Sequence, residues 1–260
     1  MSAPRQAKLA GILVLVMFLC ACATTGRQDA TGNLGVDQRN SPAKIYVEMG
    51  IAYMREGQDA VALKKLRRAI EVDDKNPEAH NVIAILYERL GESDQAADHY
   101  DRAAAIAPRD PFIRNARGSF FCKREQYEEA LKEFELALGN PLYPTRWVAL
   151  TNAGLCANRA GDTSKAEEYF RRALTANKRY SPALFKMAEL SFAQNKEMSA
   201  RAYLERFHSE VSPTAASLWL GVRVEQRLGD RVKAVEYKRK LLKEFPDAPE
   251  IQALNESERQ

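Results

Sequence analysis

The chain contains few of the residues on which catalysis and metal binding depend. Its 260 residues include only three histidines, four cysteines and two tryptophans. No glycine-rich phosphate loop and no glycine–serine–glycine nucleophile turn is present. The histidines, His80, His99 and His208, hold different positions in the repeat described below, so we expect them on different faces and predict no zinc or catalytic cluster. We therefore predict a protein that is not an enzyme and that uses no cofactor, metal or small-molecule substrate.

The sequence also lacks a strong charge of either sign and a long apolar run. Its formal net charge is +4 at pH 7, which is too small to indicate any class of partner. The apolar run at residues 9–19 is too short to span a bilayer comfortably. It follows Arg5 and Lys8, and this order is typical of a secretory signal. Because the mature chain would be nearly neutral and exported, we expect it to bind no nucleic acid.

The end of this leader resembles a bacterial lipoprotein processing site. Leu19 stands three residues before Cys22, and the small residue Ala21 directly precedes it. We predict residues 1–21 as the signal peptide and Cys22 as the lipidated first residue of the mature chain; an ordinary signal peptide with incidental cysteines is the alternative. Two or three acyl chains hold a protein firmly on a membrane. Ala23, rather than an aspartate, follows the cysteine, and by analogy with lipoprotein sorting this favours the outer membrane, facing the periplasm.

A repeat occupies most of the remaining chain. Residues 22–42 are polar and aperiodic, which indicates a lipidated flexible tether. A pattern of small, aromatic and proline residues then recurs with a spacing of 34 residues, once 36, and this period is typical of tetratricopeptide repeats. The predicted repeats are 43–76, 77–110, 111–146, 147–180, 181–214 and 215–248, followed by a C-terminal cap at 249–260. The predicted fold is all-α: a right-handed superhelical tetratricopeptide-repeat solenoid of six helix pairs with a short capping helix.

Two positions of the repeat carry the strongest structural signal. Position 15 is glycine in four repeats, Glu125 in the third and Asn195 in the fifth, and we expect this residue to end the first helix in a left-handed conformation. Position 20 is expected where paired helices approach closely. It is alanine in every repeat: Ala62, Ala96, Ala130, Ala166, Ala200 and Ala234. Repeats 5 and 6 otherwise drift from the pattern, and the two extra residues after repeat 3 are expected to bend or offset the stack.

Cys122 and Cys156 are the two thiols that remain after processing. They lie on the predicted first helices of adjacent repeats. A periplasmic disulfide is one interpretation. Helices packed about 8–10 Å apart rarely bring such positions within bonding geometry, however. We therefore favour two free thiols, with Cys156 buried and Cys122 partly exposed.

The concave side of such a solenoid is the expected site of function. First-helix positions 2, 5, 9, 12 and 13 face this side, and position 13 is basic in five repeats. One interpretation is that each cation complements the dipole of its helix; the other is a basic rail that attracts acidic groups on a partner. The basic residues are Arg55, Arg89, Lys123, Arg159 and Arg227.

Apolar residues are predicted to reach the same side. They are Val47, Ile51, Ile85, Phe112, Leu155, Phe185, Phe192 and Trp219. We expect some of them to pack against a neighbouring repeat and the rest to form an exposed strip for a partner helix or peptide. The predicted partner-binding residues are Val47, Ile51, Arg55, Asn81, Ile85, Arg89, Phe112 and Lys123.

Four segments extend the likeness beyond a generic repeat. They are Asn-Pro-Leu-Tyr-Pro at 140–144, Ala-Glu-Glu-Tyr-Phe at 166–170, Met-Ala-Glu-Leu at 187–190 and Leu-Gly-Val-Arg at 220–223. With the leader, the tether and the inserted turn, they make the chain resemble the PilF/PilW type IV pilus biogenesis lipoproteins, the secretin pilotins. The resemblance implies a periplasmic lipoprotein of the outer membrane that binds secretin subunits and promotes their localisation and assembly into a multimer. It associates secretin contact with the N-terminal repeats.

Two functions remain open at this point. The first is this pilotin function, with the type IV pilus secretin as partner, the membrane bound through the lipid anchor, and a monomer when free. The second is a general periplasmic adaptor that docks cell-wall hydrolases or proteases, because the repeat scaffold alone serves many partners.

Overall fold

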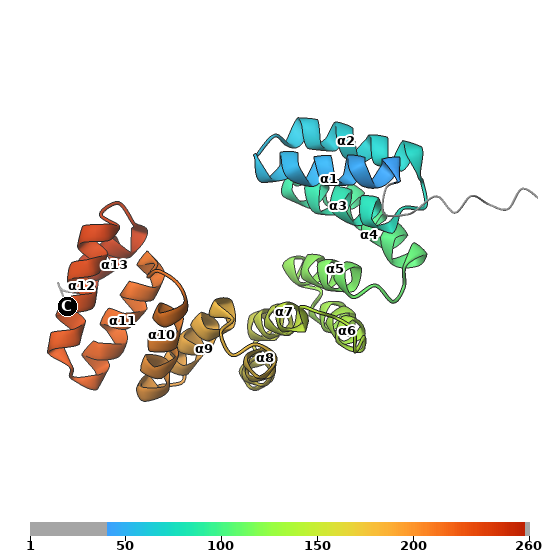
Figure 1. Ribbon diagram of the computed structural model, residues 1–260. Helices are drawn as coiled ribbons and strands as arrows, with labels where there is room; N and C mark the ends of the chain where they lie inside the picture. Colours follow the sequence, from blue (N-terminus) through green and yellow to red (C-terminus); the bar gives the residue numbers. More distant parts are fainter. Residues whose placement is uncertain (1–40, 258–260) are drawn as a thin grey trace, which may run out of the picture. The chain divides into compact units, whose positions relative to one another are not determined.

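The described part of the protein, residues 41–257 of the computed structural model, is a stack of helical hairpins without a β-strand (Figure 1). Six hairpins follow one another along the chain, and a thirteenth helix comes after the last. The all-α tetratricopeptide fold predicted from the repeat is therefore confirmed. The predicted signal peptide, Cys22 and all but the last two residues of the tether lie outside the described residues.

Each hairpin consists of two helices of similar length. The first helices are α1 (Pro42–Arg55), α3 (Pro77–Arg89), α5 (Pro111–Lys123), α7 (Arg146–Arg159), α9 (Ser181–Ala193) and α11 (Ala215–Leu228). The second helices are α2 (Asp59–Val72), α4 (Ser93–Ile106), α6 (Tyr127–Leu138), α8 (Thr163–Ala176), α10 (Glu197–Glu210) and α12 (Arg231–Glu244). The last helix is α13 (Pro249–Ser257), whose Leu254 is fully buried against α11 and α12.

Every first helix ends in the same way. Position 15 has a positive φ in all six repeats, and Glu125 (61°) and Asn195 (56°) adopt it as the four glycines do. The next residue donates its backbone N–H to the carbonyl five residues back, at 2.8–3.0 Å in each repeat. This hydrogen bond closes a Schellman motif and satisfies a carbonyl that the helix leaves unpaired. The left-handed helix end predicted from the sequence is thus confirmed, including the two repeats without glycine.

Helix pairs close over small residues on the first helix. A Cβ placed on Gly154 would lie 2.6 Å from the Phe170 ring, and one on Gly50 would lie 2.6 Å from Leu66. The alanines of position 20 are buried in all six repeats, with at most 7% of their surface exposed. In repeat 6 the small residue that faces a large one stands one position earlier in the frame, because a Cβ placed on Gly221 would lie 2.9 Å from the Tyr237 ring. That shift explains why the repeat 6 sequence fits the frame poorly.

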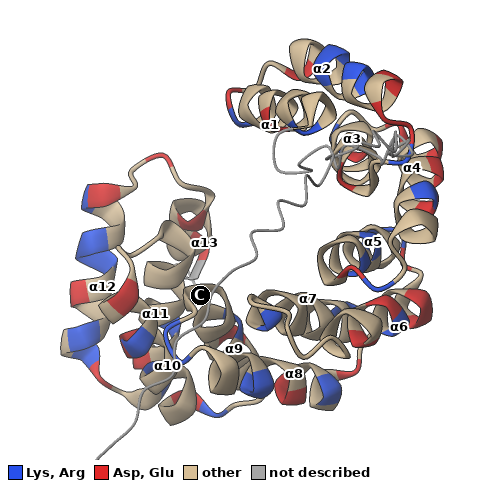
Figure 2. Cartoon of the chain, turned by 45° about the vertical axis from the view of Figure 1, so that its right-hand side comes forward, with Lys and Arg blue, Asp and Glu red and all other residues tan. Residues whose placement is uncertain are grey.

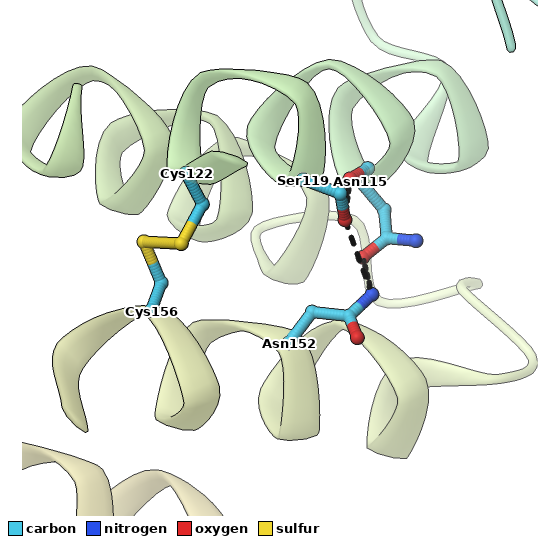
Figure 3. Close-up of a disulfide and its surroundings, with 5 residues drawn as sticks. All are labelled: Asn115, Ser119, Cys122, Asn152 and Cys156. Carbon is cyan, nitrogen blue, oxygen red and sulfur yellow. Dashed lines mark hydrogen bonds between the residues drawn. A yellow bond between two sulfur atoms is a disulfide. The ribbon is translucent and has the colours of Figure 1, made fainter. Parts of the chain in front are cut away.

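The expectation of two free thiols is wrong. Cys122 of α5 and Cys156 of α7 form a disulfide, with 5.7 Å between their Cα atoms (Figure 3), and both residues are buried. The error lies in using the distance between helix axes. A Cα atom stands about 2.3 Å from its axis, so facing Cα atoms on helices about 8–10 Å apart approach to about 3.4–5.4 Å. The upper part of that range suits a disulfide.

The residues inserted after repeat 3 form a compact turn. Asn140 accepts hydrogen bonds from two backbone N–H groups: its side-chain Oδ1 from Leu142 at 2.9 Å and its carbonyl from Tyr143 at 3.2 Å. The Tyr143 ring is buried and meets the edge of the Phe112 ring, with 5.2 Å between centroids. Leu142 stands out from the turn with 86% of its surface exposed. The insertion therefore packs the aromatic ring of Tyr143 against the first turn of α5.

No helix between residues 41 and 257 is both long and apolar enough to cross a bilayer.

Candidate functional site

The first helices line the inner side of the solenoid. Figure 2 shows α1, α3, α5, α7, α9 and α11 on this side, with the second helices behind them. Consecutive first helices contact one another, α1 with α3, α3 with α5, and so on to α11. The predicted partner-binding residues all lie on α1, α3 and α5, so the fold places them on three adjacent inner helices.

Burial divides the predicted apolar residues into two groups. Ile85 on α3 and Phe112 on α5 have 38% and 50% of their surface exposed. Ile51 is half-buried and packs against the core of the first repeats. Val47 is fully buried in that core and has no surface to offer a partner. Of the four apolar residues predicted to bind a partner, Ile85 and Phe112 are therefore the exposed ones, Ile51 is half-buried and Val47 is buried.

The basic residues of position 13 reach back to the preceding repeat. The Arg89 guanidinium donates to the carbonyl of Met54 at 2.7 Å and forms an ion pair with Asp59 at 2.9 Å. In repeat 6 the Arg227 guanidinium donates in the same register to the Phe192 carbonyl at 3.4 Å. These cations bind carbonyls at the end of the previous repeat's first helix, where a positive charge is favourable. Both arginines therefore meet the C-terminal end of the preceding repeat's first helix, whereas the dipole interpretation placed each cation at the end of its own helix.

Lys123 makes the same backward contact through an acid. Its ammonium group forms an ion pair with Glu88, on the first helix of the preceding repeat. Glu88 also accepts a hydrogen bond from the Tyr100 hydroxyl at 3.0 Å. Burial, together with the Glu88 charge, raises the pKa of the Tyr100 phenol and keeps it protonated as the donor. The basic rail is thus partly neutralised at Arg89 and Lys123.

Two predicted residues have polar groups that pair with no other described residue. Arg55 is exposed, and no carboxylate in residues 41–257 lies within ion-pair distance of it. Asn81 on α3 is half-buried, and its Oδ1 is buried without a hydrogen-bond partner among the described residues. Of the predicted cations on α1, α3 and α5, Arg55 is therefore the one whose charge is fully available to a ligand.

A polar bridge joins the inner helices beside the disulfide. The Asn152 amide on α7 donates to the Asn115 Oδ1 at 3.0 Å and to the Ser119 hydroxyl at 3.4 Å, both on α5 (Figure 3). A hollow of about 290 Å³ opens here, with Ser119, Lys123 and Asn152 among its lining residues. The bridge and the disulfide together fix repeats 3 and 4 to each other. The Asn152 bridge was not predicted, because asparagine is not part of the repeat pattern. The disulfide was considered and rejected from the distance between helix axes.

The expectation that the histidines lie on different faces is wrong for two of them. The Nδ1 atoms of His80 and His99 are 2.9 Å apart, and His80 Nε2 is 3.0 Å from the Asp74 carbonyl. Because a carbonyl only accepts, His80 Nε2 carries the proton, and His99 Nδ1 donates to His80 Nδ1. Burial, and then the charges of His80 and Arg102, lower the pKa of His99 to about 4. Within the described residues, no group of three or more His, Cys, Asp or Glu side chains could hold a metal.

Comparison with protein families identifies the repeat. A tetratricopeptide repeat model matches residues 47–111 and 117–182, and a second tetratricopeptide repeat model matches residues 182–211. The matched segments run from residue 47 within α1 to the end of α10, with a gap at residues 112–116 in α5.

Two known proteins are similar over most of the chain. The type IV pilus assembly protein PilF of Pseudomonas aeruginosa is 29% identical over 242 residues, which cover 93% of this chain and 95% of that protein. The crystal structure of PilW, described as a widely conserved type IV pilus biogenesis factor, has a TM-score of 0.76 and 30% identity, and the match covers 83% of this chain and 99% of that one. A solved structure of Pseudomonas aeruginosa PilF has a TM-score of 0.74 and 28% identity over 83% of this chain and 97% of that one.

Proposed function

Because the chain belongs to the tetratricopeptide repeat family and, within it, to the PilF/PilW group of type IV pilus biogenesis factors, we propose that it acts as a pilotin. In this function it binds subunits of the type IV pilus secretin, carries them to the outer membrane and promotes their assembly into the multimer. The observation that carries the proposal is a match over 95% of PilF and 99% of the PilW chain, rather than over a few generic repeats.

The leader and the disulfide support the proposed location. The predicted signal and Cys22 would export the chain and anchor it by lipid. Disulfides persist in oxidising compartments such as the periplasm and are rare in the cytosol. The buried Cys122–Cys156 pair therefore fits a periplasmic protein. Its role would be binding rather than catalysis, with the anchor supplying the location and the inner helices the recognition.

The inner face of α1, α3 and α5 is the proposed secretin site. Ile85 and Phe112 supply exposed apolar area, and the free Arg55 supplies a positive charge near the edge of the strip. An apolar helix or extended segment that binds across adjacent helices would cover this area and remove it from water, which is favourable. Large buried apolar side chains carry most of the binding energy at such interfaces.

Charge substitutions in the strip test this site directly. Ile85→Glu and Phe112→Glu are each expected to weaken binding of purified secretin by about tenfold or more, because truncating or charging a central contact costs about 1–2 kcal/mol or more. The matched control is Val61→Glu on α2, which has 36% exposure against 38% for Ile85 but lies on a second helix. Equal loss of binding in Val61→Glu, or unchanged binding in both strip variants, would contradict the proposed site.

The charge of the strip has its own test. Arg55→Glu is cleaner than reversal at Arg89 or Lys123, because those two cations hold repeats together. If acidic groups of the partner are attracted here, Arg55→Glu weakens binding at low salt and the difference shrinks at high salt. Binding that does not respond to Arg55→Glu at any salt concentration would discard the basic rail.

Replacement of Cys22 by alanine tests the anchor. Cys22→Ala is expected to leave the helical fold intact and to move the protein, together with the secretin, away from the outer membrane. Normal outer-membrane secretin multimers in this variant would refute the anchoring role. Capture of cell-wall hydrolases or proteases from envelope extracts, without secretin, would instead favour the general adaptor.

A further inference from the structure

A second hollow lies at the other end of the inner face, on repeats 5 and 6. It has a volume of about 340 Å³ and is formed by α9, α11 and the start of α13. Phe192 and Trp219 are its aromatic residues, and Arg223 and Arg227 its cations. It shares no lining residue with the strip on α1, α3 and α5, so the two sites are separate. Figure 2 shows α9 and α11 on the same inner side as those three helices.

Two arginines stack on one buried ring in this hollow. The guanidinium carbons of Arg227 and Arg223 lie 4.1 Å and 4.5 Å, respectively, from the centre of the Phe192 ring. The guanidinium carbon of Arg223 also lies 5.9 Å from the centre of the Trp219 ring. Phe192 is only 5% exposed, so it acts as a fixed platform. Stacking of this kind orients a planar guanidinium and leaves its N–H edge free for a ligand.

The two arginines differ in their polar partners. The Arg227 guanidinium donates to Asn195 at 3.0 Å and to the Glu197 carboxylate at 3.3 Å, so its charge is already balanced. No carboxylate or other hydrogen-bond acceptor within residues 41–257 is paired with the Arg223 guanidinium, which is exposed. Partial desolvation, and then the neighbouring Arg227 charge, lower the pKa of Arg223. Because no carboxylate is paired with it, the Arg223 guanidinium is available to bind an anion.

The acids around the hollow limit what kind of anion fits. Glu189 is occupied, since its carboxylate pairs with Lys186 at 2.7 Å. Glu250 lines the hollow from the first turn of α13, where the helix dipole favours a negative charge. One free guanidinium opposed by one free carboxylate suits a singly charged ligand better than a doubly charged phosphate. A volume of about 340 Å³ has room for one or two side chains, not for a folded surface.

We propose that this hollow binds an acidic side chain within an extended segment of a partner polypeptide, with an apolar residue next to the acid in the sequence. The carboxylate accepts hydrogen bonds from the free edge of Arg223, and the apolar neighbour lies against the exposed part of Trp219. The hollow can bind such a segment whether or not the partner polypeptide is the secretin. It gives the inner face a second contact point, so that a segment running along the face is held at both ends.

Short blocked peptides test the proposal without any secretin. The probe is acetyl-Ser-Gly-Asp-Leu-Gly-Ser-amide, and its matched control carries Asn in place of Asp; binding to the full chain in detergent is measured by calorimetry. The Asp peptide is expected to bind about tenfold tighter than the Asn peptide, a difference of about 1.4 kcal/mol, which is typical of a charge-assisted hydrogen-bonded pair. No detectable binding of the Asp peptide at millimolar concentration, or equal affinity for both peptides, would overturn the proposal.

Variants of the chain identify the responsible group. Arg223→Gln is expected to abolish the preference for the Asp peptide, and Arg223→Lys to keep only part of it, because lysine retains the charge without the planar stacked fork. Glu250→Gln should strengthen binding of the Asp peptide, since it removes the opposing carboxylate. The control is Arg239→Gln, an equal change of charge at an exposed position of α12, which should leave the preference intact. A preference that survives Arg223→Gln, or that falls in Glu250→Gln, would show that another group binds the peptide.

The outcome is separable from that of the proposed function. Loss of secretin binding in Ile85→Glu and Phe112→Glu tests the N-terminal strip, whereas the peptide preference tests Arg223 alone. Either result can fail while the other holds.

Discussion

Breaking the disulfide between α5 and α7 is expected to lower the stability of the protein by about 4 kcal/mol. The bond joins Cys122 to Cys156 across 34 residues, a segment that contains α6 and the inserted turn. For a loop of that length the chain-entropy relation gives about 3.8 kcal/mol at 25 °C. In a domain of this size, each kcal/mol corresponds to a shift in the unfolding temperature of about 2–4 °C. We therefore expect a fall of about 10 °C.

The measurement compares thermal unfolding of three samples by circular dichroism. They are the oxidised chain from residue 23 onward, the same chain with dithiothreitol, and the double variant Cys122→Ser/Cys156→Ser. The reduced and double-variant samples should unfold at similar, lower temperatures, and dithiothreitol should have no further effect on the double variant. An unfolding temperature that does not respond to reduction, or two thiols that react with maleimide in the denatured oxidised chain, would refute the reasoning.

Three further predictions follow from contacts within the stack. Gly154→Val places a Cβ 2.6 Å from the Phe170 ring, so it should lower the free energy of unfolding, measured in urea titrations, by about 1–3 kcal/mol. Adding Phe170→Leu to the same chain should recover part of this loss. If the effects of the two substitutions are simply additive, the contact between these residues is contradicted. His99 has a folded pKa of about 4, below the ordinary value of about 6.5, so the native state resists a proton that the unfolded chain accepts. Stability should therefore fall as pH drops from about 6.5 to about 4, and His99→Gln should flatten that part of the pH profile; an identical profile would contradict the assignment. The buried Glu225 pairs with Arg201, so Arg201→Met should cost about 3–5 kcal/mol, while Arg201→Met with Glu225→Leu should cost much less.

The repeat pattern predicts the backbone well because its constraints are local. The left-handed residue at the end of each first helix depends on a single φ angle, so sequence position alone identifies it, even where Glu125 takes the place of glycine. Small residues opposite large ones likewise mark the closest approach of two helices, as Gly154 and Phe170 do. These features recur with the period, and the period is visible in the sequence.

Contacts between repeats are harder to predict, because they depend on how far neighbouring helices approach. The disulfide was missed for this reason, and so was the backward reach of Arg89 to the Met54 carbonyl. The burial of Val47 could not be separated from the exposure of Ile85, since both are aliphatic residues at predicted inner positions. Position in the frame indicates a face of the helix. It does not tell how much of that face the next repeat covers.

The central claim is that the inner strip of the N-terminal repeats brings secretin subunits to the outer membrane. The most direct measurement is the amount of secretin multimer in the outer-membrane fraction of cells whose only copy of this protein carries both Ile85→Glu and Phe112→Glu. The account predicts a protein that still folds and still reaches the membrane, with secretin multimers largely lost, whereas cells with Val61→Glu retain them. A normal amount of outer-membrane multimer with the doubly substituted strip would contradict the account.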